Sequence, residues 1–334
     1  MAARKRGGGK IRRAAAAAAA LLLLAACKQP AAPETPFAAP GHALQDEAAP
    51  RAEAAPLPGP DAAAPHPADP AIRLLSAPGD AAAAGWVETG PDGPALPFFL
   101  DPGPLDHGSL DGGPLDADRG KGGSAVIPIL FLGGDRKGWS AAAMTPLWRI
   151  QAREAARRAG LSGPILTLGR PWAGDPSRWR TDAELSALAR GLAVLGRAYG
   201  FGRVDALGHS SGAHLAVGLA QETGRIRLLA AAAPPLDLAA WHMETAGSMS
   251  ARVRRQYDPL AHVAGFRADA AALVADPFDR VTPPAAWQGW LRAARAFGKP
   301  ATLVLARGGG EDRHGLILPA AEALAALRRD AAAD

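Results

Sequence analysis

The sequence predicts an α/β fold with a mostly parallel central sheet covered by helices on both faces. Apolar runs of strand length alternate along most of the chain with longer helical segments, and this order is typical of parallel sheets buried on both sides. A second observation is the pentad Gly208-His209-Ser210-Ser211-Gly212, which stands between a short apolar run and a helical segment. Together these features predict strands whose carboxyl ends share one edge of the sheet.

Each predicted element follows from a local pattern. An antiparallel pair is expected at 72–75 and 85–89, around a turn rich in Pro and Gly, and residues 91–124 are expected to form a long loop because Gly, Pro and Asp are frequent there. Apolar runs with β-branched residues predict the later strands at 126–132, 164–168, 204–207, 226–232, 271–275 and 301–306.

Helix starts are predicted from capping patterns. Thr145-Pro146 is expected to begin a helix that runs to about residue 159. Thr181 and Glu184 have capping-box spacing before a helix with leucines on one face. Further helices are expected after the pentad at 213–220, from Thr282 onward, and over 316–329.

The first 26 residues predict a secretory signal peptide. A basic stretch with six Lys and Arg residues precedes thirteen apolar residues, fewer than the roughly 20 that a membrane span needs. The stretch ends in Leu24-Ala25-Ala26-Cys27, which resembles a bacterial lipobox with lipid attached at Cys27. An ordinary signal peptide with an incidental cysteine is the alternative. We therefore expect a lipoprotein held at a membrane of the bacterial cell envelope, and with a single cysteine no internal disulfide.

Residues 27–70 are expected to be a disordered tether. Positions 28–70 hold 11 prolines and 14 alanines and few large apolar side chains, so this segment cannot bury enough surface to offset its ordering entropy. Cleavage before Cys27 removes six basic residues and no acidic ones, which changes the formal charge from +5 to −1. The precursor's basic pI therefore gives no reason to expect nucleic-acid binding. Residues 71–334 are long enough for one α/β domain.

The pentad predicts a nucleophilic serine, because strand, G-x-S-x-G and helix form the layout of a nucleophile elbow. A serine hydroxyl needs a histidine base, and that base needs a carboxylate. The loop after the predicted strand 271–275 supplies Asp276 and Asp279. The loop after 301–306 supplies His314, the only histidine beyond residue 262. Both loops follow carboxyl ends of parallel strands, where open α/β sheets place their sites.

The order of these residues, the stretch Asp279-Arg280-Val281-Thr282-Pro283 and His314-Gly315 before the last helix resemble the α/β-hydrolase superfamily. More narrowly, they are similar to its prolyl-oligopeptidase-like and dienelactone-hydrolase-like branches, over roughly residues 126–327. The resemblance implies a triad of Ser210, Asp279 and His314, with Asp276 as the alternative acid.

The same resemblance implies an oxyanion hole that uses the Ser211 N–H and one N–H after the first long strand, from either Gly134 or Asp135. His209 is a candidate pocket wall. Arg170 either faces substrate or forms a structural ion pair, with Asp175 as a partner. His214 is expected to be a core histidine, and residues 234–266 are either a cap over the pocket or a surface excursion.

We expect a serine hydrolase that acts on an ester through an acyl-enzyme. A peptidase of prolyl-oligopeptidase-like type is the first alternative; the absence of a propeller-like repeat in the sequence favours esters. A non-catalytic binding lipoprotein on the same scaffold is the second. The sequence contains no zinc-ligand pattern and no phosphate-binding loop, so neither a metal nor a cofactor is expected.

Overall fold

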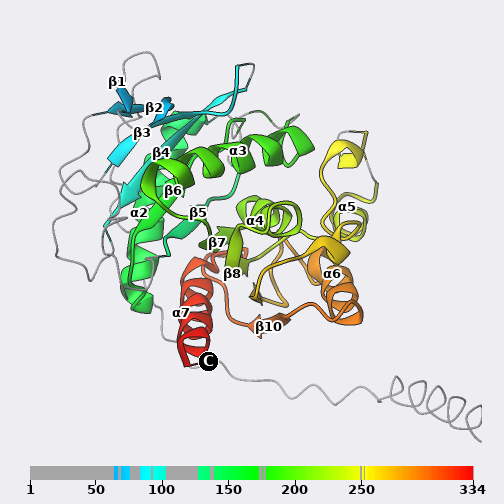
Figure 1. The fold of residues 1–334 in the computed structure, drawn as a ribbon. Helices are drawn as coiled ribbons and strands as arrows, with labels where there is room; N and C mark the ends of the chain where they lie inside the picture. Colours follow the sequence, from blue (N-terminus) through cyan, green and yellow to red (C-terminus); the bar gives the residue numbers. More distant parts are fainter. Residues whose placement is uncertain are drawn as a thin grey trace, which may run out of the picture. The chain divides into compact units, whose positions relative to one another are not determined.

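The computed structural model describes residues 64–66, 69–75, 83–91, 93–102, 127–135, 139–172, 175, 178–248, 250–251 and 253–333 (Figure 1). The expected signal peptide, Cys27 and most of the expected tether lie outside these residues. Within them, no helix combines the length and the apolar character that crossing a bilayer requires.

The described strands form one 10-stranded sheet in the order β1-β2-β3-β4-β6-β5-β7-β8-β9-β10. In this order, neighbouring strands from β1 to β6 pair antiparallel. Neighbouring strands from β6 to β10 pair parallel. The antiparallel strands are β1 (Ala64–His66), β2 (Asp69–Leu75), β3 (Ala83–Glu88) and β4 (Ala95–Asp101). The parallel strands are β5 (Ile129–Leu132), β6 (Ile165–Leu168), β7 (Val204–His209), β8 (Ile226–Ala232), β9 (Ala270–Ala275) and β10 (Ala301–Leu305).

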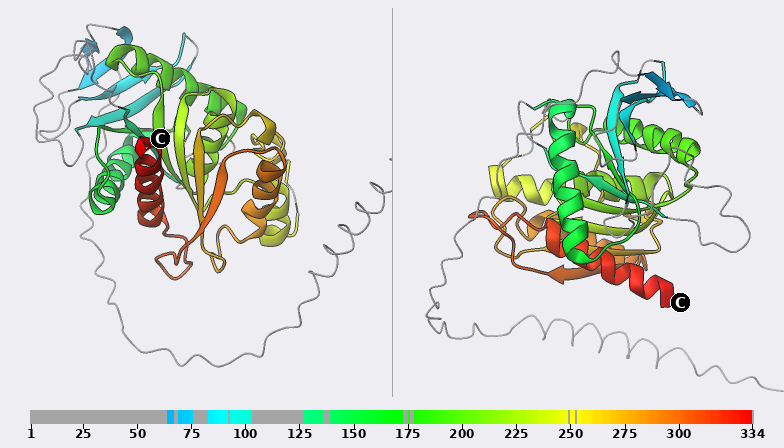
Figure 2. Two further views of the ribbon diagram at one scale, coloured as in Figure 1. Left: turned by 60° about the horizontal axis from the view of Figure 1, so that its bottom comes forward. Right: turned by 90° about the vertical axis from the view of Figure 1, so that its left-hand side faces the viewer.

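Helices cover both faces of this sheet, and the predicted α/β fold class is confirmed (Figures 1 and 2). α2 (Ala141–Ala159) and α7 (Ile317–Ala333) pack together on one face. α3 (Asp182–Tyr199), α4 (Ser211–Glu222) and α6 (Ala285–Ala296) lie on the other.

Alternation along the buried strands divides the core into two layers. On β5, Leu130 and Leu132 face the layer shared with α3 and α4, whereas Ile129 and Phe131 face the layer shared with α2 and α7. A strand buried on both faces reads as a continuous apolar run, which is why the sequence shows no polar alternation there.

The topology has a switch point between β5 and β7. From β5 the chain passes through α2 on one face to β6, and from β7 it passes into α4 on the opposite face. The loops after these neighbouring strands therefore diverge, and ligands of open α/β sheets bind at such a switch point. The Ser210 turn lies at this point, directly after β7.

Several predicted element bounds differ from the structure, and three of the differences have a clear physical reason. α2 begins at Ala141 and not at Thr145, because the Ser140 hydroxyl accepts from the Ala143 N–H and caps the helix, which leaves Pro146 inside it. The expected loop 91–124 contains β4, an apolar run whose proline hid its strand character. β1 and the start of β2 lie within the expected tether, because an edge strand can tolerate proline and needs little apolar surface.

The segment between β8 and β9 contains α5 (Leu238–Ala246) and the short 3-10 helices η2 (Val253–Arg255) and η3 (Val263–Gly265). α5 packs against α6, and η3 packs against α4 and α6. Trp241 of α5 donates from its indole N–H to the carbonyl of Val281 at 2.7 Å. The segment 234–266, expected as either a cap or a surface excursion, is therefore tied to the loop after β9.

Candidate active site

The turn from β7 into α4 has the geometry of a nucleophile elbow. Ser210 has φ 55° and ψ −124°, in a region that L-residues rarely adopt. Neighbouring glycines make the turn possible, because a Cβ on Gly208 would lie 2.5 Å from Cα of Ala213 and one on Gly212 would lie 2.1 Å from the Leu132 carbonyl oxygen. The Ser210 N–H donates to the Ala232 carbonyl at 2.8 Å, which fixes the turn against β8.

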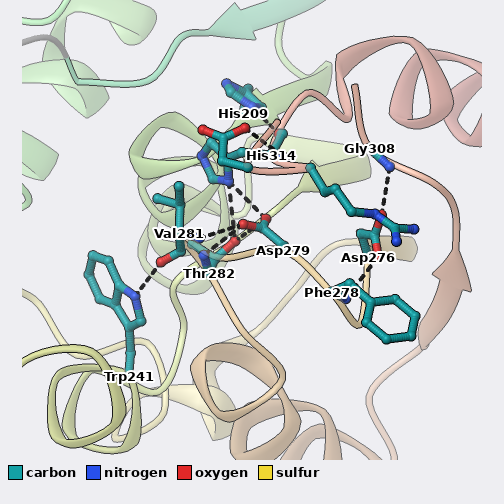
Figure 3. Close-up of polar contacts among 11 residues, drawn as sticks. His209, Trp241, Asp276, Phe278, Asp279, Val281, Thr282, Gly308 and His314 are labelled. Carbon is teal, nitrogen blue, oxygen red and sulfur yellow. Dashed lines mark hydrogen bonds and ion pairs between the residues drawn. The ribbon is translucent and has the colours of Figure 1, made fainter. Parts of the chain in front are cut away.

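His314 and Asp279 form a hydrogen-bonded pair at the ends of β10 and β9. His314 Nδ1 lies 2.8 Å from Asp279 Oδ2, and both side chains are largely buried (Figure 3). Asp279 also accepts from the backbone N–H groups of Val281 and Thr282 and from the Thr282 hydroxyl. Burial alone would raise the pKa of Asp279, but the hydrogen bonds from His314 and Thr282 outweigh it and hold the pKa below its usual value.

Asp276 binds groups of the neighbouring loops, whereas Asp279 binds the imidazole. Oδ1 of Asp276 accepts from the Phe278 N–H at 2.8 Å, and its Oδ2 accepts from the Gly308 N–H and from Arg313 Nε, each at 2.8 Å (Figure 3). Arg313 itself has φ 59° directly before His314. Asp276 therefore holds the segment that carries His314 in a strained conformation.

His209 connects the serine turn to the histidine loop. Its Nε2 lies 3.0 Å from the His314 carbonyl oxygen, so this nitrogen carries a proton, and the two rings are 5.0 Å apart between centroids. Burial, followed by the nearby His314, lowers the pKa of His209 to about 4. His209, expected as a pocket wall, is thus a neutral ring between the elbow and the loop of His314.

The loop after β5 lies against the elbow. A Cβ on Gly134 would be 3.3 Å from Cβ of Ser210, so the Gly134 backbone approaches the serine closely. The Asp135 N–H donates to the Ser211 hydroxyl at 2.7 Å. Because this bond occupies the Asp135 N–H, Asp135 is removed as a candidate oxyanion donor, while Gly134 is kept.

Arg170 forms structural ion pairs, one of its two expected roles, but its partners are Asp135 and Glu184 and not Asp175. The Arg170 side chain is fully buried. Desolvation would lower the pKa of Arg170, but the two carboxylates outweigh it and raise the pKa. A guanidinium this deep in the protein needs such partners, since an unpaired buried charge is strongly unfavourable.

His214, on α4, is the core histidine that its position on a buried helix suggested. It is fully buried, and its Nδ1 donates to the Pro235 carbonyl at 2.8 Å. Burial and the charge of Arg180 lower the pKa of His214 to about 3. Its ring is therefore neutral over the physiological pH range.

The sequence analysis did not predict the roles of several residues in this region. Glu184 was expected to close a capping box, but its carboxylate binds Arg170 and the Arg180 N–H instead. Thr282 was expected to begin a helix, yet its hydroxyl binds Asp279 at 2.7 Å. Positive φ angles at Arg313 and Ala233 carry no sequence signal, because glycine is absent from both positions. Among the described residues, no group of His, Cys, Asp and Glu side chains could hold a metal ion.

Comparison with known proteins shows similarity of fold. No family model and no curated protein matches the chain. A solved esterase from Pyrococcus furiosus matches with a TM-score of 0.50 and 15% identity, over 74% of this chain and 90% of the esterase. An acylaminoacyl peptidase in complex with a chloromethyl ketone matches with a TM-score of 0.50 and 11% identity, over 79% of this chain. A puromycin hydrolase matches with a TM-score of 0.50 and 17% identity, also over 79% of this chain.

The chain spans 42% of the acylaminoacyl peptidase and 40% of the puromycin hydrolase. Identities this low are evidence of a shared fold only. The sheet order, the helices on both faces and these similarities together establish the α/β-hydrolase fold.

Gly212→Ala should destabilise the protein severely, because the new Cβ would lie 2.1 Å from the Leu132 carbonyl oxygen, part of the backbone of a buried strand. Gly202→Ala is the matched control, since a Cβ there meets nothing within 4 Å. Thermal melts of both variants check this. Equal melting temperatures in the two variants would show that α4 does not approach β5 so closely.

Stability should fall as pH is lowered from about 6.5 toward 3. The unfolded chain protonates His209 and His214 near 6.5, whereas the folded chain does so only near 4 and 3. The unfolded state therefore binds more protons in this window, and the stability present above pH 6.5 is lost below it. His214→Asn keeps an N–H for Pro235 and removes one titrating ring. The deficit in its melting temperature should be smaller at pH 4 than at pH 8, and an equal deficit at both would contradict the assignment.

Proposed function

We propose that the protein is a serine hydrolase that cleaves esters through an acyl-enzyme. The observation that carries the proposal is the strained Ser210 turn joined, through His209, to a histidine whose Nδ1 is held by a buried carboxylate. Residues at sparsely populated backbone angles cluster at active sites, where the surrounding structure holds them in place.

In the proposed reaction, Ser210 Oγ attacks the ester carbonyl carbon and its proton passes to His314 Nε2. This nitrogen is free to act as a base because Nδ1 donates to Asp279. The tetrahedral intermediate collapses, the C–O bond to the alcohol breaks, and His314 returns the proton to the leaving oxygen. Water then repeats the sequence on the acyl-enzyme and releases the acid.

The negative oxygen of the intermediate would be bound by the N–H groups of Ser211 and Gly134. Ser211 is the first residue of α4, and N–H groups in a first helical turn have no partner within the helix. The positive end of the helix dipole favours an anion at the same place. Gly134, whose backbone lies against Ser210, supplies the second donor.

The choice of an ester rests on the similarity to the solved esterase, which the chain matches over 90% of that protein's length. The resemblance of the Asp279 and His314 segments to the prolyl-oligopeptidase-like and dienelactone-hydrolase-like branches keeps aminoacyl amides as the competing substrates. We also propose that the chain is a lipoprotein anchored at Cys27, on the evidence of residues 1–27 alone.

Ser210→Ala should abolish hydrolysis of nitrophenyl esters while leaving the melting temperature within a few degrees of wild type. The expected loss in kcat is on the order of 10⁴-fold or more, because members of a catalytic triad act as a unit. A panel of short and long acyl esters and aminoacyl anilides measures both the loss and the preference. Activity that survives in Ser210→Ala would place the nucleophile elsewhere, and a preference for anilides would replace the esterase with a peptidase.

Asp279→Asn should lower kcat by about 10³- to 10⁴-fold, since an amide can hold the wrong tautomer of His314. Asp276→Asn is the control from the same loop: it loses the ion pair to Arg313 and should mainly lower stability, by about 1–3 kcal/mol. Measuring kcat/KM and chemical unfolding for both variants separates the roles. If Asp276→Asn is the inactive variant and Asp279→Asn the active one, the acid is Asp276.

Cys27→Ala should move the protein from the membrane fraction to the soluble fraction without changing its specific activity. Lipid attachment would use Cys27 and the proposed chemistry Ser210, two separate residues, so the two should not be coupled. Fractionation followed by an ester assay tests this. A variant that still sediments with membranes would contradict anchoring through Cys27.

A further inference from the structure

Four side chains behind the proposed oxyanion hole form one buried network. Arg170 binds Glu184 with two parallel bonds, from Nε to Oε1 and from Nη2 to Oε2, each 2.9 Å long. Its Nη1 donates to the Ser211 hydroxyl at 2.7 Å and forms an ion pair with Asp135. The side chains of Arg170 and Glu184 are fully buried, and that of Asp135 is 11% exposed.

The network joins the two segments that carry the proposed donors. The Ser211 hydroxyl oxygen accepts two hydrogen bonds, one from the Asp135 N–H and one from Arg170. This oxygen therefore links the first residue of α4 to the loop after β5. Asp135 is held twice, through its N–H and through its carboxylate. Gly134 precedes it directly, so the direction of the Gly134 N–H depends on these contacts.

The charges of the network indicate that it acts through geometry. One guanidinium and two carboxylates give a formal sum of −1, which would oppose a developing oxyanion and not attract it. A bidentate guanidinium is planar and rigid, so it fixes distances between its partners. The backbone N–H groups then remain as the donors, and the network determines where they point.

We propose that Arg170 and the Ser211 hydroxyl are positioning residues that hold the N–H groups of Gly134 and Ser211 toward one point beside Ser210. The inference rests on the proposed function. Glu184 supports it by fixing Arg170 from α3, a role that diverts its carboxylate from the expected capping box.

The test is the rate at which a fluorophosphonate labels the full-length chain. As the bond between Ser210 Oγ and phosphorus forms, fluoride leaves and the phosphoryl oxygen of the probe occupies the oxyanion hole. The labelling rate therefore reports on the oxyanion donors. Ser211→Ala removes the shared acceptor and keeps the Ser211 N–H. A small misplacement of an oxyanion donor should lower the limiting labelling rate by about 10- to 100-fold and change the reversible binding constant by less than about 3-fold. Thr89→Ala is the matched control, because it removes a buried hydroxyl that binds the Pro94 carbonyl between β3 and β4, and its rate should be unchanged.

Arg170→Met tests the same network from its centre. Arg227→Met is its control, since Arg227 pairs with buried Asp205 at the opposite ends of the strands. If the network is one unit, the double variant of Ser211→Ala and Arg170→Met labels no more slowly than the slower single variant. Should Arg170→Met fail to fold, the Ser211→Ala rate decides.

Wild-type rates in Ser211→Ala, with labelling lost in Ser210→Ala, would overturn the positioning role and leave the hydrolase standing. A wild-type chain that is not labelled at all would overturn both.

Discussion

The close approach of α4 to the end of β5 is the constraint on which the rest of the site depends. Gly212 lies so near the Leu132 and Gly133 carbonyl oxygens that no side chain fits between them. This contact forces the sharp turn at Ser210 and brings the loop after β5 against the serine. Trp148 of α2 packs on the other side of that loop, where a Cβ on Gly133 would be 2.2 Å from the indole nitrogen. The loop after β5 is thus fixed on two sides by contacts that only glycine permits.

Two carboxylates three residues apart take different roles because their surroundings differ. Asp276 meets backbone N–H groups and a guanidinium, so it organises chain segments. Asp279 meets an imidazole and a hydroxyl, so it orients a ring. Hydrogen bonds hold the pKa of each below its usual value despite burial, and both carboxylates stay ionised at neutral pH. The two roles can be told apart only when the hydrogen-bond partners of each carboxylate are known.

The parts that the sequence predicted well are those with a repeated local signal. Continuous apolar runs located β7, β8 and β9, and the glycines of the pentad located the turn at Ser210. Asp279 could be preferred over Asp276 only through a family resemblance, since the spacing alone allows both. Arg170 could not be placed from the sequence, because its partners Asp135 and Glu184 lie 35 and 14 positions away and meet it only after β5 and α3 pack. Strained backbone at Arg313 was equally hidden, since tertiary contacts impose it against the residue's own preference.

The measurement that tests the account most directly is peptide mapping of the wild-type chain after reaction with a fluorophosphonate, read by mass spectrometry. A serine activated by the pair of His314 and Asp279 should carry the only adduct, at one per chain, on the peptide that contains Ser210. An adduct on any other residue, or an unmodified chain under conditions that label known serine hydrolases, would contradict the assignment of Ser210 as the nucleophile.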